Sequence, residues 1–444
     1  MRVAGIIAEY NPFHEGHLHL FHKVREELGS DTPIVVVMSG DFVQRGEPAI
    51  LDYAPRTCAV LSCGADLVFE LPFTFATGSA DRFAEGAVAM LCRSSIVTDL
   101  YFGAECASIS ALSALSDIDF ESIPEFSEKL DSYLKDGQSY AAAWEQAASS
   151  VLNGRVAPEL EEQFSSILRK PNNLLAIAYL RALKKLGSKI TPHAVLREEN
   201  YHEETLEAER FPSATALRKA LLGENTGISD PVSRVQWISS LGSLSSYIPA
   251  PMLSEMLSSW NKNTKPMGAQ ALISSALPLL RATDAEDLGK VAHMGQNLAF
   301  HLKRRVSDMH YQADIPLEKQ FYEQVHTRCF SYVRILRALS SLVTGQKESD
   351  LTSLSEPKYL RLLGFSEHGR SLLKRMRENC DLPILSRTSD ARHYTKDPLF
   401  ARMNELDILS HDWWTQEARN TWEEDYHFEV IQYKRNRIYR SGKA

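Results

Sequence analysis

The segment Glu9-Tyr-Asn-Pro-Phe-His-Glu-Gly-His-Leu-His-Leu20 places the pattern His-x-Gly-His directly after a short apolar run, residues 3 to 8. The run is long enough for one buried strand, and the Asn-Pro dipeptide ends it. Apolar residues then recur at helical spacing, at Phe21, Val24 and Leu28. We therefore expect His14 and His17 at the point where a strand turns into a helix.

A helix start that carries histidines is suited to binding phosphate. Its first N–H groups lack partners and lie at the positive end of the helix dipole. Gly16 lets the backbone approach a ligand closely, and imidazoles can donate hydrogen bonds to phosphoryl oxygens. The pattern therefore predicts adenylyl-transfer chemistry, with His14 and His17 as the catalytic residues.

Two other interpretations of the same segment stay open. Histidines are common near helix starts, so His14, His17, His19 and His22 could form a plain histidine-rich surface. They could also bind a metal, but no cysteine is nearby and no second group of ligands is spaced to complete a zinc shell. We therefore assign no metal site.

The length of 444 residues, with 44% hydrophobic and 24% charged residues, allows a large soluble enzyme and suggests two or three domains. The chain shows no leader pattern and no apolar stretch near eighteen residues. This predicts a cytoplasmic protein that neither is secreted nor spans a membrane. Its six cysteines form no C-x-x-C pair, as is typical of reduced thiols. The net charge of −8 still allows a local basic face that binds nucleic acid.

The pattern of strands and helices changes near residue 225. Before it, helical stretches alternate with apolar β-rich runs at 3–8, 33–38, 66–71, 99–102 and 189–196. This alternation predicts an α/β fold with a mostly parallel sheet over residues 1–225. After the turn-rich segment Gly223 to Asp230, strand signals fade and helical stretches dominate, at 298–309, 318–343 and 369–380. We therefore expect a mainly α-helical C-terminal domain over residues 226–444.

The loops that follow the strands should meet in one crevice, because open α/β sheets bind ligands at the carboxyl ends of their strands. The first strand leads into the histidine segment, and the next three lead into Ser39-Gly-Asp41, Glu70-Leu-Pro72 and Gly103-Ala-Glu105. Asp41 is a candidate for positioning the nucleotide or Mg²⁺. An acidic residue after a strand is, however, as often a cap or turn former.

Three further groups of residues fit a nucleotide site, each with a structural alternative. Asn172 opens a helical run, where an asparagine is most simply an N-cap. Ser213, Thr215 and Arg218 open another helix, where they could bind the departing polyphosphate or serve as a cap and a surface charge. Arg197 follows the last strand, a place where an arginine is usually a surface residue. Each of these groups alone is weak evidence for a nucleotide site, and their occurrence together supports it.

Motifs along most of the chain agree with one family. They are residues 9–17, Ser39 to Pro48, Gly64 to Pro72, Gly137-x-Ser-Tyr140, Pro171-Asn-Asn173 and Ser213 to Arg218. Together they resemble the bacterial tRNA(Met) cytidine acetate ligases. Tyr359-Leu-Arg-Leu-Leu-Gly-Phe365 and Leu382-Pro-Ile-Leu385 are similar to the helical region of that family, so nearly the whole chain is covered.

The resemblance implies a Rossmann-like nucleotidyltransferase domain in residues 1–225 and a tRNA-binding domain in residues 226–444. It implies ATP, expected with Mg²⁺, as co-substrate, and acetate and elongator tRNA(Met) as partners. The product that it implies is N4-acetylcytidine at the wobble position, made through acetyl-adenylate. The ATP-binding residues it implies are Ile7, Ala8, Glu9, Tyr10, Asn11, Pro12, Phe13, His14, Glu15, Gly16, His17, Leu18, His19, Leu20, Gly103, Asn172 and Arg197.

Basic residues in the second half are the candidates for RNA contacts. They are Arg370, Lys374 and Arg377, at helical spacing, the run Lys303-Arg-Arg305, and the tail residues Lys434, Arg435, Arg437 and Arg440. Each group could instead be a solvated face. The lysine- and arginine-rich stretch typical of the family is less basic here, in residues His326 to Arg337.

The mechanism that follows is in-line attack by an acetate oxygen on the α-phosphorus of ATP, with pyrophosphate leaving. Positioning and electrostatics carry such reactions, so His14 and His17 would stabilise the oxygens on which charge builds. One alternative is a small-molecule adenylyltransferase that joins AMP to a phosphorylated cofactor precursor, although such an enzyme does not need the helical half. Another is an RNA-binding protein that has lost activity, against which the intact histidine motif argues.

Overall fold

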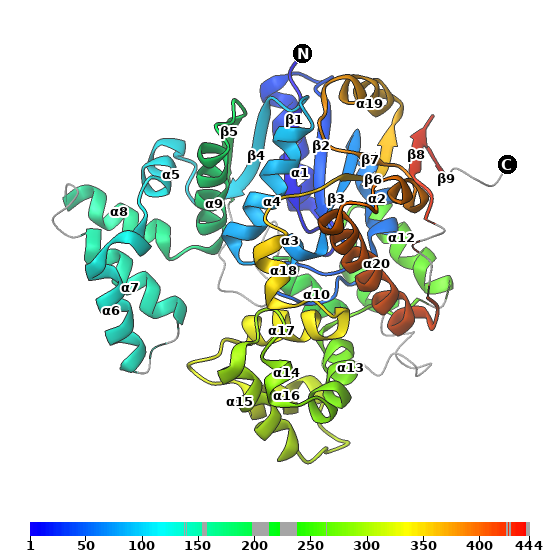
Figure 1. The fold of residues 1–444 in the computed structure, drawn as a ribbon. Helices are drawn as coiled ribbons and strands as arrows, with labels where there is room; N and C mark the ends of the chain where they lie inside the picture. The colour runs from blue at the N-terminus through cyan, green and yellow to red at the C-terminus, as the bar shows by residue number, and fades with distance from the viewer. Residues whose placement is uncertain are drawn as a thin grey trace.

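The computed structural model describes residues 1–136, 138, 140–152, 158–197, 213–222, 238–262, 264–422, 425 and 428–440. Within these residues the strands form one sheet in the order β5-β4-β1-β2-β3-β6-β8-β9, with β7 paired to β6 (Figure 1). No described helix is long and apolar enough to cross a membrane. Gly137, Ser139 and the predicted boundary segment Gly223 to Asp230 lie outside the described residues.

Five strands run parallel and confirm the α/β prediction. They are β1 (Ala4–Ala8), β2 (Ile34–Ser39), β3 (Leu67–Leu71), β4 (Asp99–Ala104) and β5 (Thr191–Leu196). Each lies within two residues of the start and end predicted from the apolar runs. The side chains of β2 and β3 are buried on both faces, as expected for parallel strands covered by helices.

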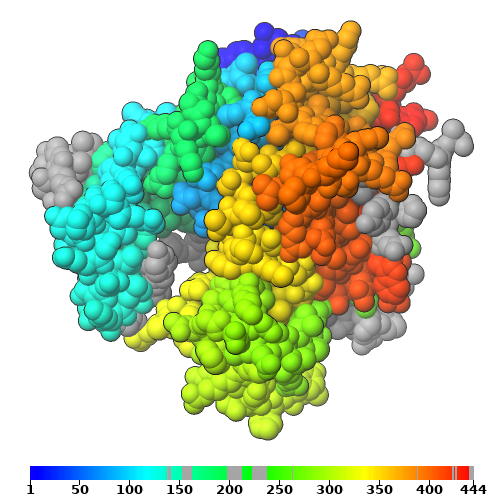
Figure 2. Space-filling model, viewed as in Figure 1, coloured from blue at the N-terminus to red at the C-terminus, as the bar shows by residue number. Residues whose placement is uncertain are grey.

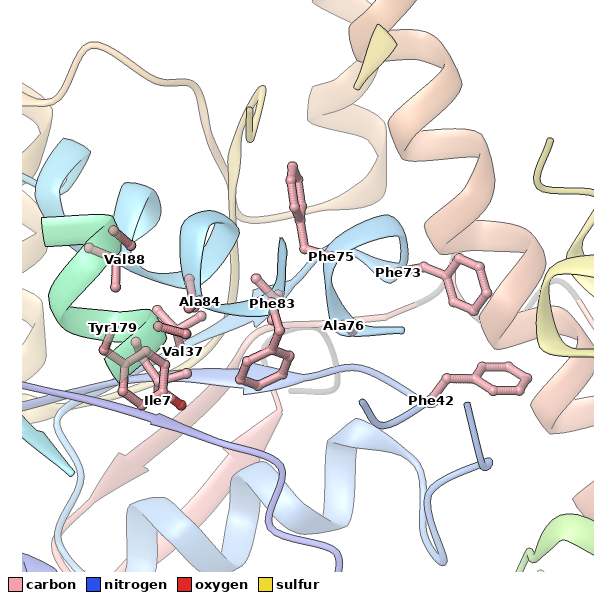
Figure 3. Packing of buried hydrophobic residues seen from close by; sticks show 14 of the residues in the cluster. Ile7, Val37, Phe42, Phe73, Phe75, Ala76, Phe83, Ala84, Val88 and Tyr179 are labelled. Carbon is pink, nitrogen blue, oxygen red and sulfur yellow. The ribbon is translucent and has the colours of Figure 1, made fainter. Parts of the chain in front are cut away.

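The two faces of this sheet are buried under different helices. One face is covered by α4 (Ala80–Arg93) and α9 (Pro171–Lys185). The other is covered by α1 (Glu15–Leu28), α2 (Tyr53–Ser62), α10 (Ala214–Leu222) and α12 (Ala250–Asn261). Because side chains alternate along a strand, Val37 packs with α4 and α9 while its neighbour Val36 packs on the opposite face. Figure 3 shows Val37 with Phe83 of α4 and Tyr179 of α9 on the first face.

Two helical lobes extend from the sheet. The first contains α5 (Ile109–Ser116), η1 (Phe120–Ser122), α6 (Pro124–Lys135), α7 (Tyr140–Leu152) and α8 (Pro158–Leu168). The second contains α13 (Ala269–Ala282), α14 (Ala285–Leu288), α15 (Gly295–Ser307), α16 (Leu317–Val325) and α17 (Tyr332–Thr344). The two lobes stand apart on the face shown in Figure 2, the first in cyan and the second in yellow-green.

The helical predictions for the second half hold in part. The stretch 298–309 matches α15, and 369–380 matches α19 (Glu367–Asn379). The stretch 318–343 was expected to be continuous, but it is divided between α16 and α17, since the Ser331 side chain caps a new helix. The remaining short and long helices are α3 (Phe73–Ala76), α18 (Glu348–Ser353), η2 (Thr388–His393) and α20 (Pro398–Arg419).

Helices dominate after residue 225, as predicted, but strands that the fading signals did not indicate also occur there. In the described part of the chain, four strands follow it: β6 (Leu360–Ser366), β7 (Ile384–Leu385), β8 (Ile431–Lys434) and β9 (Arg437–Arg440). The segments 359–365 and 382–385, expected in a helical region, overlap β6 and β7. The reason is tertiary, because β6 completes the free side of β3 as an antiparallel neighbour about 300 positions away in the chain. The division into a catalytic domain, 1–225, and a tRNA-binding domain, 226–444, stays a prediction.

Candidate active site

One cavity of about 600 Å³ opens at the carboxyl ends of β1, β4 and β5, which we call the carboxyl edge of the sheet. Most of the predicted nucleotide residues line it: Ile7, Ala8, Glu9, Tyr10, Asn11, His14, Gly16, His17, His19, Leu20, Gly103, Asn172, Arg197, Ser213, Thr215 and Arg218. The predicted convergence is thus confirmed for the loops after the first and fourth strands, and Arg197 after the fifth strand joins them. The segments Ser39 to Asp41 and Glu70 to Pro72, expected in the same crevice, do not line the cavity. Four members of the implied ATP segment, Pro12, Phe13, Glu15 and Leu18, do not line the cavity.

The two histidines begin α1 in a reciprocal cap. His14 is the N-cap residue, and its Nδ1 accepts a hydrogen bond from the Gly16 N–H at 3.1 Å. The His17 Nδ1 in turn accepts from the His14 N–H at 3.2 Å. The two ring centroids lie 3.7 Å apart. Because each Nδ1 accepts, a neutral imidazole carries its proton on Nε2, so both rings can donate from that atom.

Burial keeps both imidazoles neutral. It lowers the pKa of His14 to about 3, and the positive charges of Arg197 and Arg218 act in the same direction. The pKa of His17 is also well below its ordinary value, first because of burial and then because of His14 and Arg197. The two neutral imidazoles and the guanidinium groups of Arg197 and Arg218 line one cavity, which suits an anionic ligand.

The carbonyl groups behind the cavity are held by a buried arginine that the sequence reasoning missed. Arg56 of α2 is fully buried. Its guanidinium donates to five backbone carbonyls, those of Glu9, Ser39, Gly40, Leu51 and Asp52. It therefore ties the end of β1 to the end of β2. The available signal was that this arginine is the one charged residue of α2.

Gly103, Asn172 and Arg197 form one connected rim of the cavity. A side chain on Gly103 would meet the Arg197 side chain at 3.0 Å, so glycine leaves room for it. Arg197 Nη1 donates to Asn172 Oδ1 at 3.3 Å, and Asn172 Nδ2 donates to Glu105 at 2.7 Å. The expected N-cap role of Asn172 was wrong, because Lys170 is the cap residue of α9 and Asn172 lies inside the first turn.

Ser213 and Arg218 are both engaged where α10 begins. The Ser213 side chain accepts from the Ala216 N–H at 3.1 Å, which is the predicted cap. Arg218 donates to the Asn11 carbonyl at 2.9 Å and lies 3.6 Å from Glu47. This contact joins α10 to the loop that carries the histidines, so the two motifs, about 200 residues apart in the chain, form one wall.

Asp41 has a structural role instead of the suggested nucleotide or Mg²⁺ contact. It is buried and does not line the cavity. Its Oδ1 accepts from the Tyr53 N–H at 3.1 Å, and its Oδ2 lies 2.7 Å from His411 Nδ1 of α20. Both oxygens are therefore occupied, and the residue joins the loop after β2 to the C-terminal helix.

The predicted RNA contacts lie away from the cavity. Arg370, Lys374 and Arg377 are exposed on α19, which begins beside the start of β3, where the Ser366 N–H donates to the Asp66 carbonyl at 2.9 Å. Lys434, Arg435, Arg437 and Arg440 belong to the β8–β9 hairpin beside it. This is the amino edge of the sheet, opposite the cavity (Figure 1). In the second lobe, Lys303 donates to backbone carbonyls at the end of α13, while Arg304 and Arg305 are exposed.

A second group of lining residues was not predicted. It comprises Lys23, Val43, Gln44, Arg45, Ala80, Phe83, Phe102, Pro171, Leu174, Leu175, Tyr179, Val195, Leu196 and others near β1. Gln44 and Arg45 belong to the loop Ser39 to Pro48, which packs on α17. Any side chain on Gly46 would collide with the backbone of Arg337, and Arg337 Nε donates to the Gln44 carbonyl at 2.8 Å. The second lobe therefore reaches the rim of the cavity.

Comparison with known proteins agrees with this geometry. A family model described as HIGH Nucleotidyl Transferase matches residues 1–427. A tRNA(Met) cytidine acetate ligase of Thermoanaerobacter sp. (strain X514) is 32% identical over 423 residues, which cover 95% of this chain and 96% of that protein. One of Fervidobacterium nodosum is 32% identical over 400 residues, or 89% of this chain and 86% of that protein.

A solved structure has the same fold over almost the whole chain. The crystal structure of Thermotoga maritima TmcAL bound with alpha-thio ATP matches with a TM-score of 0.83 and 27% identity, over 98% of this chain and 100% of that chain. The apo form of the same protein matches equally well. The chain therefore belongs to the HIGH nucleotidyl transferases and, among them, to the tRNA(Met) cytidine acetate ligase family.

Proposed function

We propose that the protein is an ATP-dependent ligase that acetylates the N4 amine of the wobble cytidine of elongator tRNA(Met). Acetate and ATP form acetyl-adenylate and pyrophosphate, and the amine then takes the acetyl group. The observation that carries this proposal is that two neutral histidines, His14 and His17, line one cavity together with Arg197 and Arg218. Family membership supports the substrate assignment.

The first step, formation of acetyl-adenylate, requires the site to stabilise negative charge on the phosphoryl oxygens. The two Nε2–H groups and the start of α1 supply donors that are already oriented, since both rings are held through Nδ1. Ser213, Thr215 and Arg218 at the start of α10 are placed to bind the departing pyrophosphate. Gly103, Asn172 and Arg197 form the rim that would hold the rest of the nucleotide.

Mg²⁺ fits the site as a companion of ATP. The metal prefers oxygen ligands and commonly joins substrate phosphates to one or two carboxylates. Glu9 is the one carboxylate among the described residues that line the cavity. No group of three or more side chains suited to a metal occurs in the described part of the chain. Mg²⁺ would therefore be held mainly by phosphate oxygens, where it neutralises their charge.

The RNA substrate must bring one base into the cavity. A wobble base lies in a single-stranded loop, so splaying it out of the stack costs little. Although the chain carries a net charge of −8, the cavity is lined by Lys23, Arg45, Arg197 and Arg218, which suits anionic substrates. We assign residues 226–444 to tRNA binding and the reaction to the cytoplasm, where tRNA is used.

The test is acetylation of native tRNA by the purified protein with ATP and labelled acetate, followed by nucleoside mass analysis. We expect N4-acetylcytidine only when ATP and acetate are both present. Pyrophosphate exchange into ATP that depends on acetate would report the first step alone. Folded protein that gives exchange without acetate, or no acetylcytidine with native tRNA, would overturn the proposal and point to a small-molecule adenylyltransferase.

A further inference from the structure

We propose that Glu9 binds the N4 amine of the target cytidine and takes its proton during acetyl transfer. This inference rests on the proposed function and adds a catalytic residue to its second step. Glu9 directly follows β1 and is half-buried at the cavity wall. It precedes His14 by five residues on the same loop, and both residues line the same cavity.

The carboxylate of Glu9 is held in one orientation. Its Oε1 accepts from the Gln44 N–H at 2.8 Å, and its backbone carbonyl accepts from Arg56 Nη1 at 2.8 Å. Gln44 is itself fixed, because its carbonyl accepts from Arg337 Nε. The second oxygen, Oε2, has no hydrogen-bond partner among the described residues. One oxygen thus anchors the group and the other is available to a substrate.

The walls near Glu9 suit a flat base. Ile7, Phe83, Phe102 and Tyr179 line the same cavity. Figure 3 shows Ile7 and Tyr179 close together with Phe83 beside them. The charge of Glu9 contributes, after burial, to raising the pKa of Tyr179, which places the phenol near the carboxylate. Flipped bases are commonly stacked on aromatic side chains and read by hydrogen bonds at their pairing edge.

A carboxylate also selects cytosine by its chemistry. The N4 amine of cytosine donates, and glutamate and aspartate are the usual acceptors for it. Uracil presents an oxygen acceptor at the same position, which a carboxylate repels. The carboxylate of Glu9 therefore matches the group that the reaction modifies.

The acetyl-transfer step balances with Glu9 as the base. The N4 lone pair attacks the carbonyl carbon of acetyl-adenylate and forms the C–N bond. The bond from that carbon to the phosphate oxygen breaks, and AMP leaves with the electron pair. One N4 proton passes to Glu9 Oε2 and later to water. General bases of this kind contribute about 10²–10⁴ in rate.

Glu9→Gln separates this role from a role in binding ATP or Mg²⁺. Glutamine keeps the size of the side chain and an acceptor for the Gln44 N–H, but it cannot take a proton at neutral pH. We expect acetylcytidine formation to fall by about 10²–10⁴, while acetate-dependent pyrophosphate exchange falls at least about tenfold less. With hydroxylamine, which needs no base, the variant should form acetyl-hydroxamate nearly as fast as the unmodified protein.

Two further variants complete the test. Glu9→Asp keeps a carboxylate and should recover part of the second step. Glu85→Gln, on the exposed face of α4 outside the cavity, is the matched control and should match the unmodified protein in both steps. Thermal melting of each variant confirms that it folds.

The outcomes are distinct. Equal loss of exchange and acetylation in Glu9→Gln would assign Glu9 to ATP or Mg²⁺ and overturn the inference. Acetylation at the unmodified rate would leave Glu9 without a role. If the unmodified protein itself makes no acetylcytidine, the proposed function fails, which is a different result from a failure of Glu9 alone.

Discussion

The two edges of the sheet both carry basic groups, but they use them differently. At the carboxyl edge, Arg56 and Arg218 donate to backbone carbonyls and the histidines cap each other, so every group has one orientation. At the amino edge, the basic side chains of α19 and of residues 434–437 in the β8–β9 hairpin are exposed. Charge alone therefore does not mark a catalytic site, because basic residues occur at both edges of the sheet. Fixed geometry does, because stabilising a transition state requires donors that need no reorganisation.

The largest effect should come from removing the anchor behind the carboxyl edge. Arg56→Met leaves five carbonyls without their donor, and each buried unsatisfied acceptor costs about 1–3 kcal/mol. We expect the free energy of unfolding in urea to drop by at least about 3 kcal/mol. Arg93→Met removes two surface ion pairs, with Glu356 and Asp381, and should cost less than about 1 kcal/mol. Equal losses in the free energy of unfolding in the two variants would contradict the distinction between a buried, fixed arginine and one at the surface.

Next in size is the loss of a histidine donor. His14→Ala or His17→Ala should lower acetate-dependent pyrophosphate exchange at least about a hundredfold, because each removes an oriented N–H at the phosphoryl group. Affinity for tRNA should stay nearly unchanged. His14→Asn keeps a side chain that can cap α1, so it should melt like the unmodified protein yet lose the same activity. His22→Ala, exposed on the same helix, is the control, and normal exchange in His14→Ala would defeat the assignment.

The pH dependence of stability offers a third test at the carboxyl edge. Burial alone would lower the pKa of His411, but the charge of Asp41 and the hydrogen bond to it prevail and raise it to about 9. The folded protein therefore holds this proton at a pH where the unfolded chain has lost it. Stability from this pair is complete below about pH 6.5 and disappears as pH rises to about 9, a change of up to about 3 kcal/mol.

His411→Gln keeps a partner for Asp41 but does not titrate. Urea unfolding between pH 6 and 9 should therefore show a shallower loss of stability in the variant than in the unmodified protein. Parallel curves would mean that the contact with Asp41 does not raise the pKa of His411 in the folded protein.

The smallest effect is expected at the amino edge. Reversing the charges of Arg435 and Arg437 should weaken tRNA binding modestly and reduce its dependence on salt, by about one unit of slope for each phosphate that is no longer neutralised. Pyrophosphate exchange should not change, since these residues lie opposite the cavity. Lys290→Glu, which reverses the charge of an exposed lysine away from the hairpin, is the control. If binding and its salt dependence match those of the control, the hairpin has no role with RNA.

Prediction from sequence succeeded where the relevant physics is local. The five parallel strands and the start of α1 follow from short apolar runs and from the breaks between them, and the structure confirms them. Strand β6 was missed, because it forms a strand by pairing with β3 and not through an alternation of apolar and polar residues in its own sequence. Asp41 was ambiguous for the same reason, since its partner His411 is 370 positions away.

The sequence by itself therefore determined the α/β class, the positions of the parallel strands and of the loops after them, and the helix start that carries the histidines. These features depend on the spacing of apolar residues and on chain breaks, which are properties of neighbouring residues. The tertiary structure alone decided which charged groups act. It buried Arg56 among backbone carbonyls, paired Asp41 with His411 of α20, bound Glu9 Oε1 to the Gln44 N–H at the cavity wall and placed the basic hairpin on the opposite edge. These outcomes depend on contacts between segments that are distant in the chain, and local sequence patterns do not predict such contacts.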